Sequence, residues 1–566
     1  MPPAYQYMPL PADDDNDSIR VLELLPGTFD NPVIYVKLRS TNVEAVRFKF
    51  EAVSYTWGDP TPCKIIVFEE SNARLQVSRN CYSVLRHLRN PVETRTLWID
   101  AICINQADIP ERNSQVLIMG LIYAAAIHTA VFLGYSTPGS QLLFRHLART
   151  DRLRSLGEEQ RAESLPRPTE KVIRELEHLL KRSWFSRVWV IQEVMRSFRV
   201  TFMCGRDTAT IEALTSCLYG NVTQMRVLSK FPAPLELDHE SFRENLKRCS
   251  TPARKIYFLA AGAGLCESTD PRDRILALTP LCGGVSPEID GLVDYEQETE
   301  SIFRKFALLF LQDGGLALLW MIRHPHLREM PSWVPDWTEN RGKSHRTLQI
   351  PDFFDAYDSN QLSGDYKDFH IGSIDDIQSS APQCLVISGE RYGRIQELGP
   401  IIHIKNEDIQ TRIKSVRSLI DELESMRHGS NLPNWPDSIV QAFQHLTIDD
   451  IHDLFGTMCE MKPIEVNQEL SFNVAIACHE SRVFITSKGE LGLSSKALQH
   501  GDLVCLVKGA IEPCVLRERD HRQWTIISGA CVLLDIERGY RKAKLDWTWR
   551  YMNQIIPGPR ERFMIC

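Results

Sequence analysis

The first 130 residues alternate between strand-like and helix-like patterns of apolar and polar positions. Two strand-like runs, residues 19–27 and 33–39, are separated by the turn-forming sequence TFDNP and are predicted to pair as a hairpin. Residues 46–52 alternate between apolar and charged side chains, which predicts a half-buried strand that runs on into a turn at Gly58, Asp59 and Pro60.

Helical periodicity appears between the later strands of this region. Ser78 is predicted to cap a short amphipathic helix that precedes an apolar strand over residues 96–100. Asp108 is predicted to cap a second helix, since a proline and a glutamate follow it within the first turn. A further strand ends at Gly134. This order of strand, helix, strand, helix and strand predicts a parallel sheet with crossover helices.

The pattern changes twice along the rest of the chain. Residues 136–170 are rich in Arg, Ser, Pro and Glu and are interpreted as an insertion or mobile loop, and β-type runs separated by turns return from residue 384. The predicted organisation is a flexible tail over 1–18, an α/β domain over 19–205, a mainly helical region over 206–380, and a β-rich domain over 381–566 with a helical insertion near 407–460.

Composition and charge exclude several classes of protein. A formal net charge of -8 and a pI near 6.1 argue against nucleic-acid binding by phosphate neutralisation. No apolar run approaches the ~20 residues of a membrane span, and the N-terminus does not resemble a signal peptide. The 15 cysteines are scattered without a C-x-x-C pair, which indicates neither a disulfide framework nor a zinc site and fits reduced thiols in the cytoplasm.

Two acidic residues stand out because each interrupts an apolar run. Asp100 ends a strand, where the ligands of parallel sheets bind, and Glu193 lies within VWVIQEV. A buried carboxyl is costly unless it is paired or used. In the structural alternative, Asp100 caps the following turn and Glu193 pairs with Arg187 or Arg196; periodicity alone favours this alternative.

Three blocks of sequence, residues 50–60, 97–134 and 182–193, resemble in order and spacing the signature blocks of the fungal heterokaryon-incompatibility (HET) domain. The resemblance covers about residues 46–205. It implies a cytoplasmic protein of non-self recognition that triggers cell death when incompatible fungal cells fuse. It also implies an incompatibility partner protein, with homo-oligomerisation as a further mode of assembly.

The HET domain is more remotely similar to the TIR domain, a flavodoxin-like α/β module that in many members cleaves NAD. This resemblance implies that Glu193 is the catalytic carboxylate of an NAD glycohydrolase, with NAD as substrate and no cofactor or metal. The alternative is a non-enzymatic scaffold that oligomerises or recruits partners. The residues expected to bind the substrate are Ser54, Tyr55, Trp57, Gly58, Asp59, Asp100, Asn105, Gln106, Trp184 and Arg187.

Overall fold

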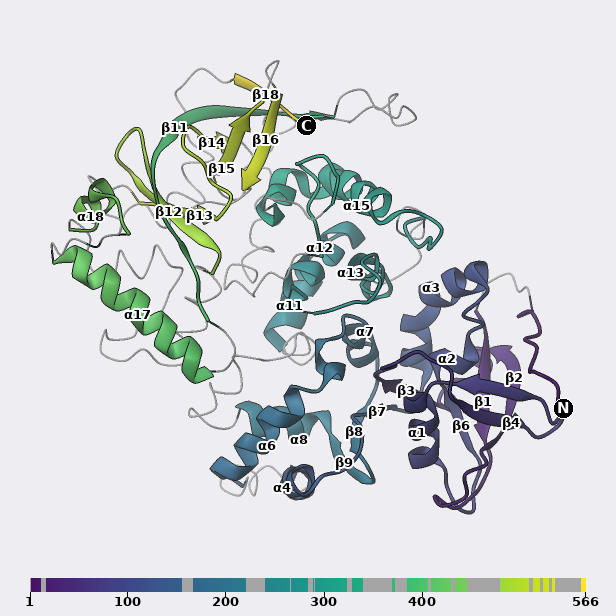
Figure 1. Ribbon diagram of the computed structural model, residues 1–566. Coiled ribbons are helices and arrows are strands. Elements are labelled where there is room, and N and C mark those ends of the chain that lie inside the picture. The colour runs from purple at the N-terminus through teal and green to yellow at the C-terminus, as the bar shows by residue number, and fades with distance from the viewer. Residues whose placement is uncertain are drawn as a thin grey trace. The chain divides into compact units, whose positions relative to one another are not determined.

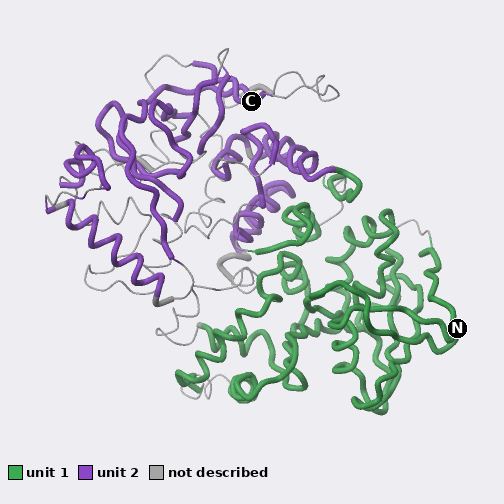
Figure 2. Tube along the Cα trace, in the orientation of Figure 1, with its two compact units in different colours: residues 1–243, 265–297 green, residues 244–264, 298–566 purple. Residues whose placement is uncertain are grey.

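The computed structural model divides the chain into two compact units, each built from two separate segments (Figure 2). Unit 1 comprises residues 1–243 and 265–297, and unit 2 comprises residues 244–264 and 298–566. The chain therefore passes between the units three times. The structure describes residues 2–11, 17–154, 166–219, 240–264, 266–282, 289, 291–322, 328–338, 369–371, 384–405, 409–428, 432, 434–444, 479–507, 510, 513–519, 523–528, 532–534 and 561–566.

Unit 1 is built on a mixed sheet whose strands follow the order β5-β4-β2-β1-β6-β3-β7-β8-β9 (Figure 1). The four neighbours β6, β3, β7 and β8 run parallel, whereas β1 pairs antiparallel with β2 and β6 and β9 pairs antiparallel with β8. The predicted hairpin is confirmed, and the predicted parallel sheet is the centre of a larger mixed one. The strands are β1 (Ser18–Leu24), β2 (Tyr35–Asn42), β3 (Glu51–Tyr55), β4 (Lys64–Phe68), β5 (Arg74–Val77), β6 (Arg95–Trp98), β7 (Thr129–Phe132), β8 (Val200–Cys204) and β9 (Asp207–Thr210).

Both predicted helix caps of unit 1 are confirmed. The Ser78 hydroxyl accepts a hydrogen bond from the Cys81 N–H at 3.2 Å, and the Asp108 carboxylate accepts one from the Glu111 N–H at 3.0 Å. The helices of this unit are η1 (Glu44–Val46), α1 (Arg79–Leu88), α2 (Asp100–Cys103), α3 (Ile109–Ala125), α4 (Pro138–Arg154), α6 (Glu170–Leu180), η2 (Ser183–Ser186), α7 (Val190–Met195), α8 (Ile211–Tyr219), α13 (Asp273–Leu276) and η4 (Thr279–Cys282).

The strand predicted over residues 46–52 begins later than expected. A 3-10 turn occupies Glu44–Val46, and Phe48 adopts a left-handed backbone conformation with a φ of 55°. The Phe48 N–H donates to the Ala125 carbonyl at 2.7 Å, so a tertiary hydrogen bond fixes the bend. Strand β3 starts only at Glu51. Alternating polarity was therefore a misleading signal here.

The interpretation of residues 136–170 as an insertion or mobile loop is wrong where the structure describes them. Helix α4 occupies Pro138–Arg154, and its Leu143, Phe144 and Leu147 side chains are buried in a core shared with α6, α8 and β8. This helix covers the sheet beside β9. The N-terminal residues, expected to be a flexible tail, also make contacts: the Tyr7 hydroxyl donates to the Ile102 carbonyl at 2.9 Å.

Unit 2 combines helices with a small β-barrel. Strands β14, β15, β16, β18 and β11 form a closed ring because β14 also pairs with β11, and β12, β13 and β17 extend the sheet from β11. These strands are β11 (Leu385–Ile402), β12 (Ser481–Thr486), β13 (Leu491–Ser495), β14 (Leu503–Val507), β15 (Cys514–Glu518), β16 (Gln523–Ser528), β17 (Val532–Leu534) and β18 (Glu561–Ile565); β10 (Phe369–Ile371) also pairs with β11.

The described helices of unit 2 lie before and within the β-rich part. The predicted helical insertion is present as α17 and α18, which share a buried core with β12 and β13. Parts of the predicted domains lie outside the described residues, among them 155–165, 220–239, 339–368, 372–383, 445–478 and 535–560. The helices are α11 (Glu240–Arg248, which begins in unit 1), α12 (Pro252–Gly262), α15 (Thr299–Gly314), η5 (Gly315–Met321), α17 (Ile409–Arg427) and α18 (Asp437–Gln444).

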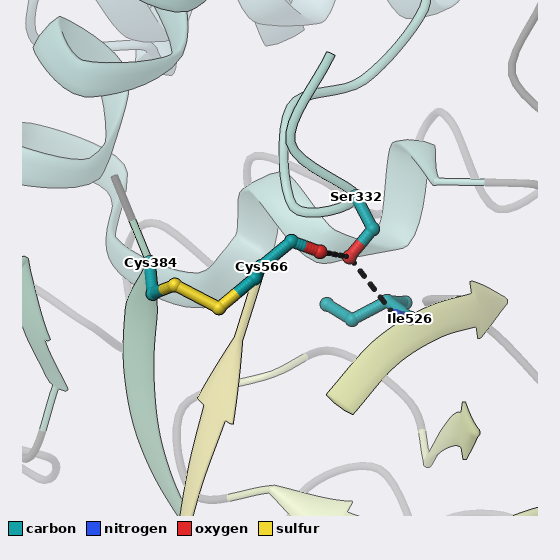
Figure 3. Close-up of a disulfide and its surroundings, with 4 residues drawn as sticks. All are labelled: Ser332, Cys384, Ile526 and Cys566. Carbon is teal, nitrogen blue, oxygen red and sulfur yellow. Dashed lines mark hydrogen bonds between the residues drawn. A yellow bond between two sulfur atoms is a disulfide. The ribbon is translucent and has the colours of Figure 1, made fainter. Parts of the chain in front are cut away.

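A disulfide joins Cys384 to Cys566 and ties the start of β11 to the end of β18 (Figure 3). The expectation that the cysteines are all reduced is wrong for this pair, which is 182 residues apart in the chain and adjacent in the barrel. The Ser332 hydroxyl donates to the Cys566 carbonyl at 2.7 Å and accepts from the Ile526 N–H at 3.2 Å, which fastens the same end to β16. In the part of the chain that the structure describes, no helix has the length and apolar character needed to cross a membrane.

Candidate functional site

Glu193 lies in a short broken helical stretch between α6 and β8. The sequence RSWFSRVWVIQE forms a 3-10 turn, η2, and then helix α7 rather than one continuous helix. The Glu193 side chain, 2% exposed, accepts a hydrogen bond from the Ser54 hydroxyl of β3. The Trp184 indole N–H in turn donates to the Ser54 oxygen at 2.6 Å. A chain of indole, hydroxyl and carboxyl thus joins η2, the central strand and α7.

The electrostatic environment of Glu193 keeps its carboxyl close to half-protonated at neutral pH. Burial raises the pKa of Glu193 to about 7, and the Arg187 guanidinium and the Ser54 hydrogen bond oppose this rise while the charge of Asp100 adds to it. Burial likewise raises the pKa of Asp100, again opposed by Arg187. The charge of Asp100 therefore acts on Glu193, and the Arg187 guanidinium lowers the pKa of both acids.

Asp100 begins helix α2 directly after strand β6. One carboxylate oxygen accepts from the Trp57 indole N–H at 2.9 Å, and the other accepts from the Ala101 N–H at 2.7 Å. The Gln106 side-chain amide donates to the Asp100 carbonyl at 3.0 Å. Asp100 thus caps its own turn, as the structural alternative predicted, and also fixes a partly exposed indole at the carboxyl end of β3.

The structural alternative does not describe Glu193. The Arg187 side chain donates to the Tyr55 carbonyl at 2.6 Å, and that of Arg196 donates to the Pro280 carbonyl at 3.1 Å, so neither forms a salt bridge with Glu193. Tyr55 is buried at the end of β3, so Arg187 is held at the strand end beside both acids.

Three of the predicted substrate-binding residues take part in local structure. The exposed Asp59 accepts hydrogen bonds from the backbone N–H and the hydroxyl of Thr61, at 2.9 and 2.6 Å. The Asn105 N–H donates at 2.7 Å to Glu111, which pairs with Arg20. Gly58 has a φ of 65° and forms the turn after β3.

Sequence reasoning missed Asn80, which supports this turn. The Asn80 side-chain amide donates to the Thr56 carbonyl at 3.0 Å, and a Cβ added at Gly58 would come within 2.5 Å of that amide nitrogen. Gly58 is therefore required by both its backbone conformation and its close neighbour. A glycine before Asp and Pro was the available signal, although it did not point to Asn80.

Sequence reasoning also missed the returning segment, defined as residues 266–282, which holds the stretch that carries Glu193. The Val188 N–H donates to the Glu267 carbonyl at 3.0 Å, and the Trp189 indole N–H donates to the Asp273 carboxylate at 2.9 Å. Asp273 also accepts from the Tyr295 hydroxyl at 2.6 Å, and burial raises its pKa to about 6. An acid within the apolar run DRILAL was the signal for it.

The arrangement provides a buried carboxyl, that of Glu193, which can give or take a proton near neutral pH. Partly exposed polar groups lie near it. Glu193, Ser54 and Trp184 are all buried, whereas Trp57, Asp100 and Arg187 reach partly into solvent. Among the described residues, no group of three or more His, Cys, Asp or Glu side chains is placed to hold a metal ion.

Comparison with known proteins agrees with the sequence blocks. Residues 50–193 match the family model described as "Heterokaryon incompatibility protein (HET)". The chain is 25% identical to "Heterokaryon incompatibility protein 6, OR allele" of Neurospora crassa, over 85% of this chain and 80% of that protein. No solved structure gives a significant match. The matched range begins one residue before β3 and ends at Glu193, so it includes both Ser54 and Glu193.

Proposed function

From the match of residues 50–193 to the heterokaryon-incompatibility family model, we propose that the chain acts in the cytoplasm in fungal non-self recognition and promotes regulated cell death. Its similarity to the Neurospora crassa incompatibility protein extends over 85% of the chain and so includes both units. Such a protein needs an incompatibility partner, and homo-oligomerisation is a further mode of assembly.

The proposed output of the domain is cleavage of the bond between nicotinamide and ribose in NAD, with Glu193 as the catalytic carboxylate. The observation that carries this proposal is a buried carboxyl on α7 that has a pKa of about 7 and is bonded to Ser54 of the parallel strand β3. Taken in chain order, these strands lie in the order second, first, third, fourth, as in flavodoxin-like folds, which supports the likeness to TIR domains. Ser54 lies on the first of them, opposite Val131 of the third, where such folds bind ligands.

The chemistry suits an enclosed carboxylate. When the bond to nicotinamide breaks, its electron pair leaves with the ring nitrogen and positive charge develops on the ribose until water adds. An ionised Glu193 would stabilise that charge, and a water-poor setting strengthens the interaction. Trp57 offers an indole face for a flat ring, and Asp100 fixes the position of that indole.

The test is nicotinamide release from NAD by the full-length protein, compared with its Glu193→Gln variant. The full chain is used because the returning segment, residues 266–282, holds α7 in place. We expect the substitution to lower the rate at least ~100-fold, and the wild-type rate to rise with pH through about 7 as Glu193 ionises. Glu212→Gln, the same change at an exposed position of α8, should leave the rate unchanged.

Two results would overturn parts of this proposal. If the wild-type protein released no nicotinamide, the proposed NAD cleavage would be wrong. If Glu193→Gln left the release of nicotinamide unchanged, the assignment of Glu193 as the catalytic residue would be wrong. Expression of both forms in fungal cells tests the cell-death role separately, because death without NAD loss would keep the incompatibility role and reject the reaction.

A non-enzymatic scaffold is the second candidate, and one observation favours it. Glu193 is sealed from solvent and bonded to Ser54, which is the arrangement expected of a carboxyl that supports the fold. Under this reading, Glu193→Gln kills cells as efficiently as the wild type and NAD is not consumed. The enzyme reading requires both properties to be lost together.

A further inference from the structure

Four large apolar side chains are exposed at one edge of the unit 1 sheet. Each lies two or three residues before one of the four parallel strands: Val92 before β6, Phe48 before β3, Ile127 before β7 and Phe198 before β8. Their exposed fractions are 80%, 52%, 44% and 74%. Because these strands are parallel neighbours, the four positions line a single edge, opposite the end that carries Trp57 and Asp100. We call these four residues the amino-edge patch.

The loops that carry Phe48, Ile127 and Phe198 are fixed to one another by backbone hydrogen bonds. The Phe48 N–H donates to the Ala125 carbonyl, the Ile127 N–H to the Phe50 carbonyl at 2.9 Å, and the Thr129 N–H to the Arg199 carbonyl at 2.8 Å. Phe48 keeps a positive φ that bulky residues rarely adopt, yet its ring gains little burial from it. The exposure of these rings is therefore held in place by the fold rather than produced by a loose loop.

Basic residues flank the aromatic rings of Phe48 and Phe198, although the whole chain carries a net charge of -8. The Arg47 guanidinium lies 5.3 Å from the Phe48 ring centroid, the Arg199 guanidinium lies 5.9 Å from that of Phe198, and Lys49 is exposed beside them. Exposed acids near this edge include Glu44, which pairs with Arg47 at 2.7 Å, Glu93 beside Val92, and Asp30 in the loop after β1.

The remaining titratable groups at this edge turn inward. Glu51 is paired with Arg95 and lies 3.3 Å from His128, and burial lowers the pKa of His128, so this histidine adds no charge near neutral pH. The Arg196 side chain is bonded to the Pro280 carbonyl. Lys49 and Arg199 therefore supply the outward charge beside Phe48 and Phe198.

We propose that the amino-edge patch docks unit 1 on the surface of an anionic membrane. Exposed aromatic and aliphatic side chains flanked by Lys and Arg insert at the boundary between headgroups and acyl chains, while the basic groups attract anionic lipids. A protein partner would need pockets that match the shape of these protruding side chains. A lipid surface closes around protruding side chains without needing a matching shape.

The test is co-sedimentation of the full-length protein with vesicles of phosphatidylcholine alone and with 30% phosphatidylserine added. We expect binding to the anionic vesicles that weakens at high salt, and a reduction of the partition coefficient of about tenfold or more in a Phe48→Gly/Phe198→Ser double variant. Glycine suits the φ of 55° at position 48, so the variant should fold, and circular dichroism checks that it does.

A matched control separates this patch from exposed apolar residues in general. Tyr135 is 63% exposed and follows β7 at the opposite end of the strand, so Tyr135→Ser should leave vesicle binding unchanged. Equal binding by wild type and double variant would overturn the proposal. So would an absence of vesicle binding combined with a concentration-dependent dimer that the double variant abolishes, which would make the patch an interface between copies of the chain.

Discussion

Glu193 in unit 1 and Asp502 in unit 2 are both buried carboxyls, but the two units treat them differently. Asp502 receives two hydrogen bonds from the Arg517 guanidinium, each at 2.8 Å, and a third from the Gln499 N–H at 2.7 Å. Glu193 accepts one hydrogen bond, from the Ser54 hydroxyl. The nearby Arg187 guanidinium donates to the Tyr55 carbonyl instead. A buried acid held by a bidentate guanidinium is explained by the fold, whereas one whose hydrogen-bond partner is a neutral hydroxyl marks a candidate for chemistry.

Removing the negative charge of Glu193 should therefore stabilise unit 1 at alkaline pH. With a folded pKa of about 7 against the ordinary glutamate value of 4.5, the native carboxyl binds its proton more tightly than the unfolded one. The stability that this provides is present below pH 4.5 and is lost as the pH rises through 7. At roughly 1.4 kcal/mol per pKa unit, Glu193→Gln should raise the free energy of unfolding by on the order of 3 kcal/mol at pH 8.

The measurement is urea unfolding at pH 5 and pH 8, followed by hydrogen exchange in peptides from β3 and α7. The gain in the free energy of unfolding should be much smaller at pH 5, where residue 193 is uncharged in the folded state of both the wild type and the variant. A loss of stability at pH 8 would show that Glu193 is stabilised as a carboxylate, and the contrast with Asp502 would disappear.

The same chemical change at Asp502 should have the opposite sign. Asp502→Asn removes the charge that faces Arg517, and we expect a loss of about 2 kcal/mol in the free energy of unfolding of unit 2. This is below the usual range for a buried pair, because the Arg517 side chain is 29% exposed and water replaces part of the interaction. Hydrogen exchange in β14 and β15 reports the loss.

Glu561→Gln is the matched control for that experiment, since Glu561 pairs with Arg391 at 2.8 Å on the exposed side of the barrel. Its effect should stay within about 0.5 kcal/mol. If Asp502→Asn stabilised unit 2, the charge of Asp502 would be unfavourable like that of Glu193, and the contrast between the two acids would be wrong.

A smaller effect compares two glycines with positive φ, one in each unit. Gly58→Ala introduces a Cβ within 2.5 Å of the Asn80 amide, whereas Gly489→Ala, at a φ of 87°, meets nothing within 4 Å. Both changes should cost about 1 kcal/mol of backbone strain, and Gly58→Ala should cost about 1 kcal/mol more because it breaks the hydrogen bond from Asn80 to the Thr56 carbonyl. Thermal unfolding of the two variants measures the difference, and equal losses would contradict the supporting role of Asn80.

Local signals in the sequence predicted the parts of the fold that depend on neighbouring residues. The caps at Ser78 and Asp108 follow from a side chain and a backbone N–H three residues apart, so a single window contains them. The bend at Phe48 depends on a carbonyl 77 positions away, which no window shows. Helix α4 was missed because the polar composition of the residues after it outweighed the helical spacing of its own apolar side chains.

The candidate site was predictable to the same extent. An acid within an apolar run identified both Asp100 and Glu193, because burial of a carboxyl is unusual whatever surrounds it. The partner of Glu193 was not predictable, since Ser54 lies 139 positions earlier in the chain. The hydrogen bond from Trp189 to Asp273 was likewise not predictable, because Asp273 lies 84 positions further on, in the segment where the chain returns to unit 1.

The closure of the barrel in unit 2 sets an order for its synthesis. Strand β11 pairs with β18, with Leu385 opposite Ile565, so the ring cannot be completed before residue 565 has left the ribosome. At common translation rates that leaves β11 without this neighbour for roughly tens of seconds. During that interval an open strand edge is available to other chains, and a nascent-chain chaperone would find its substrate there.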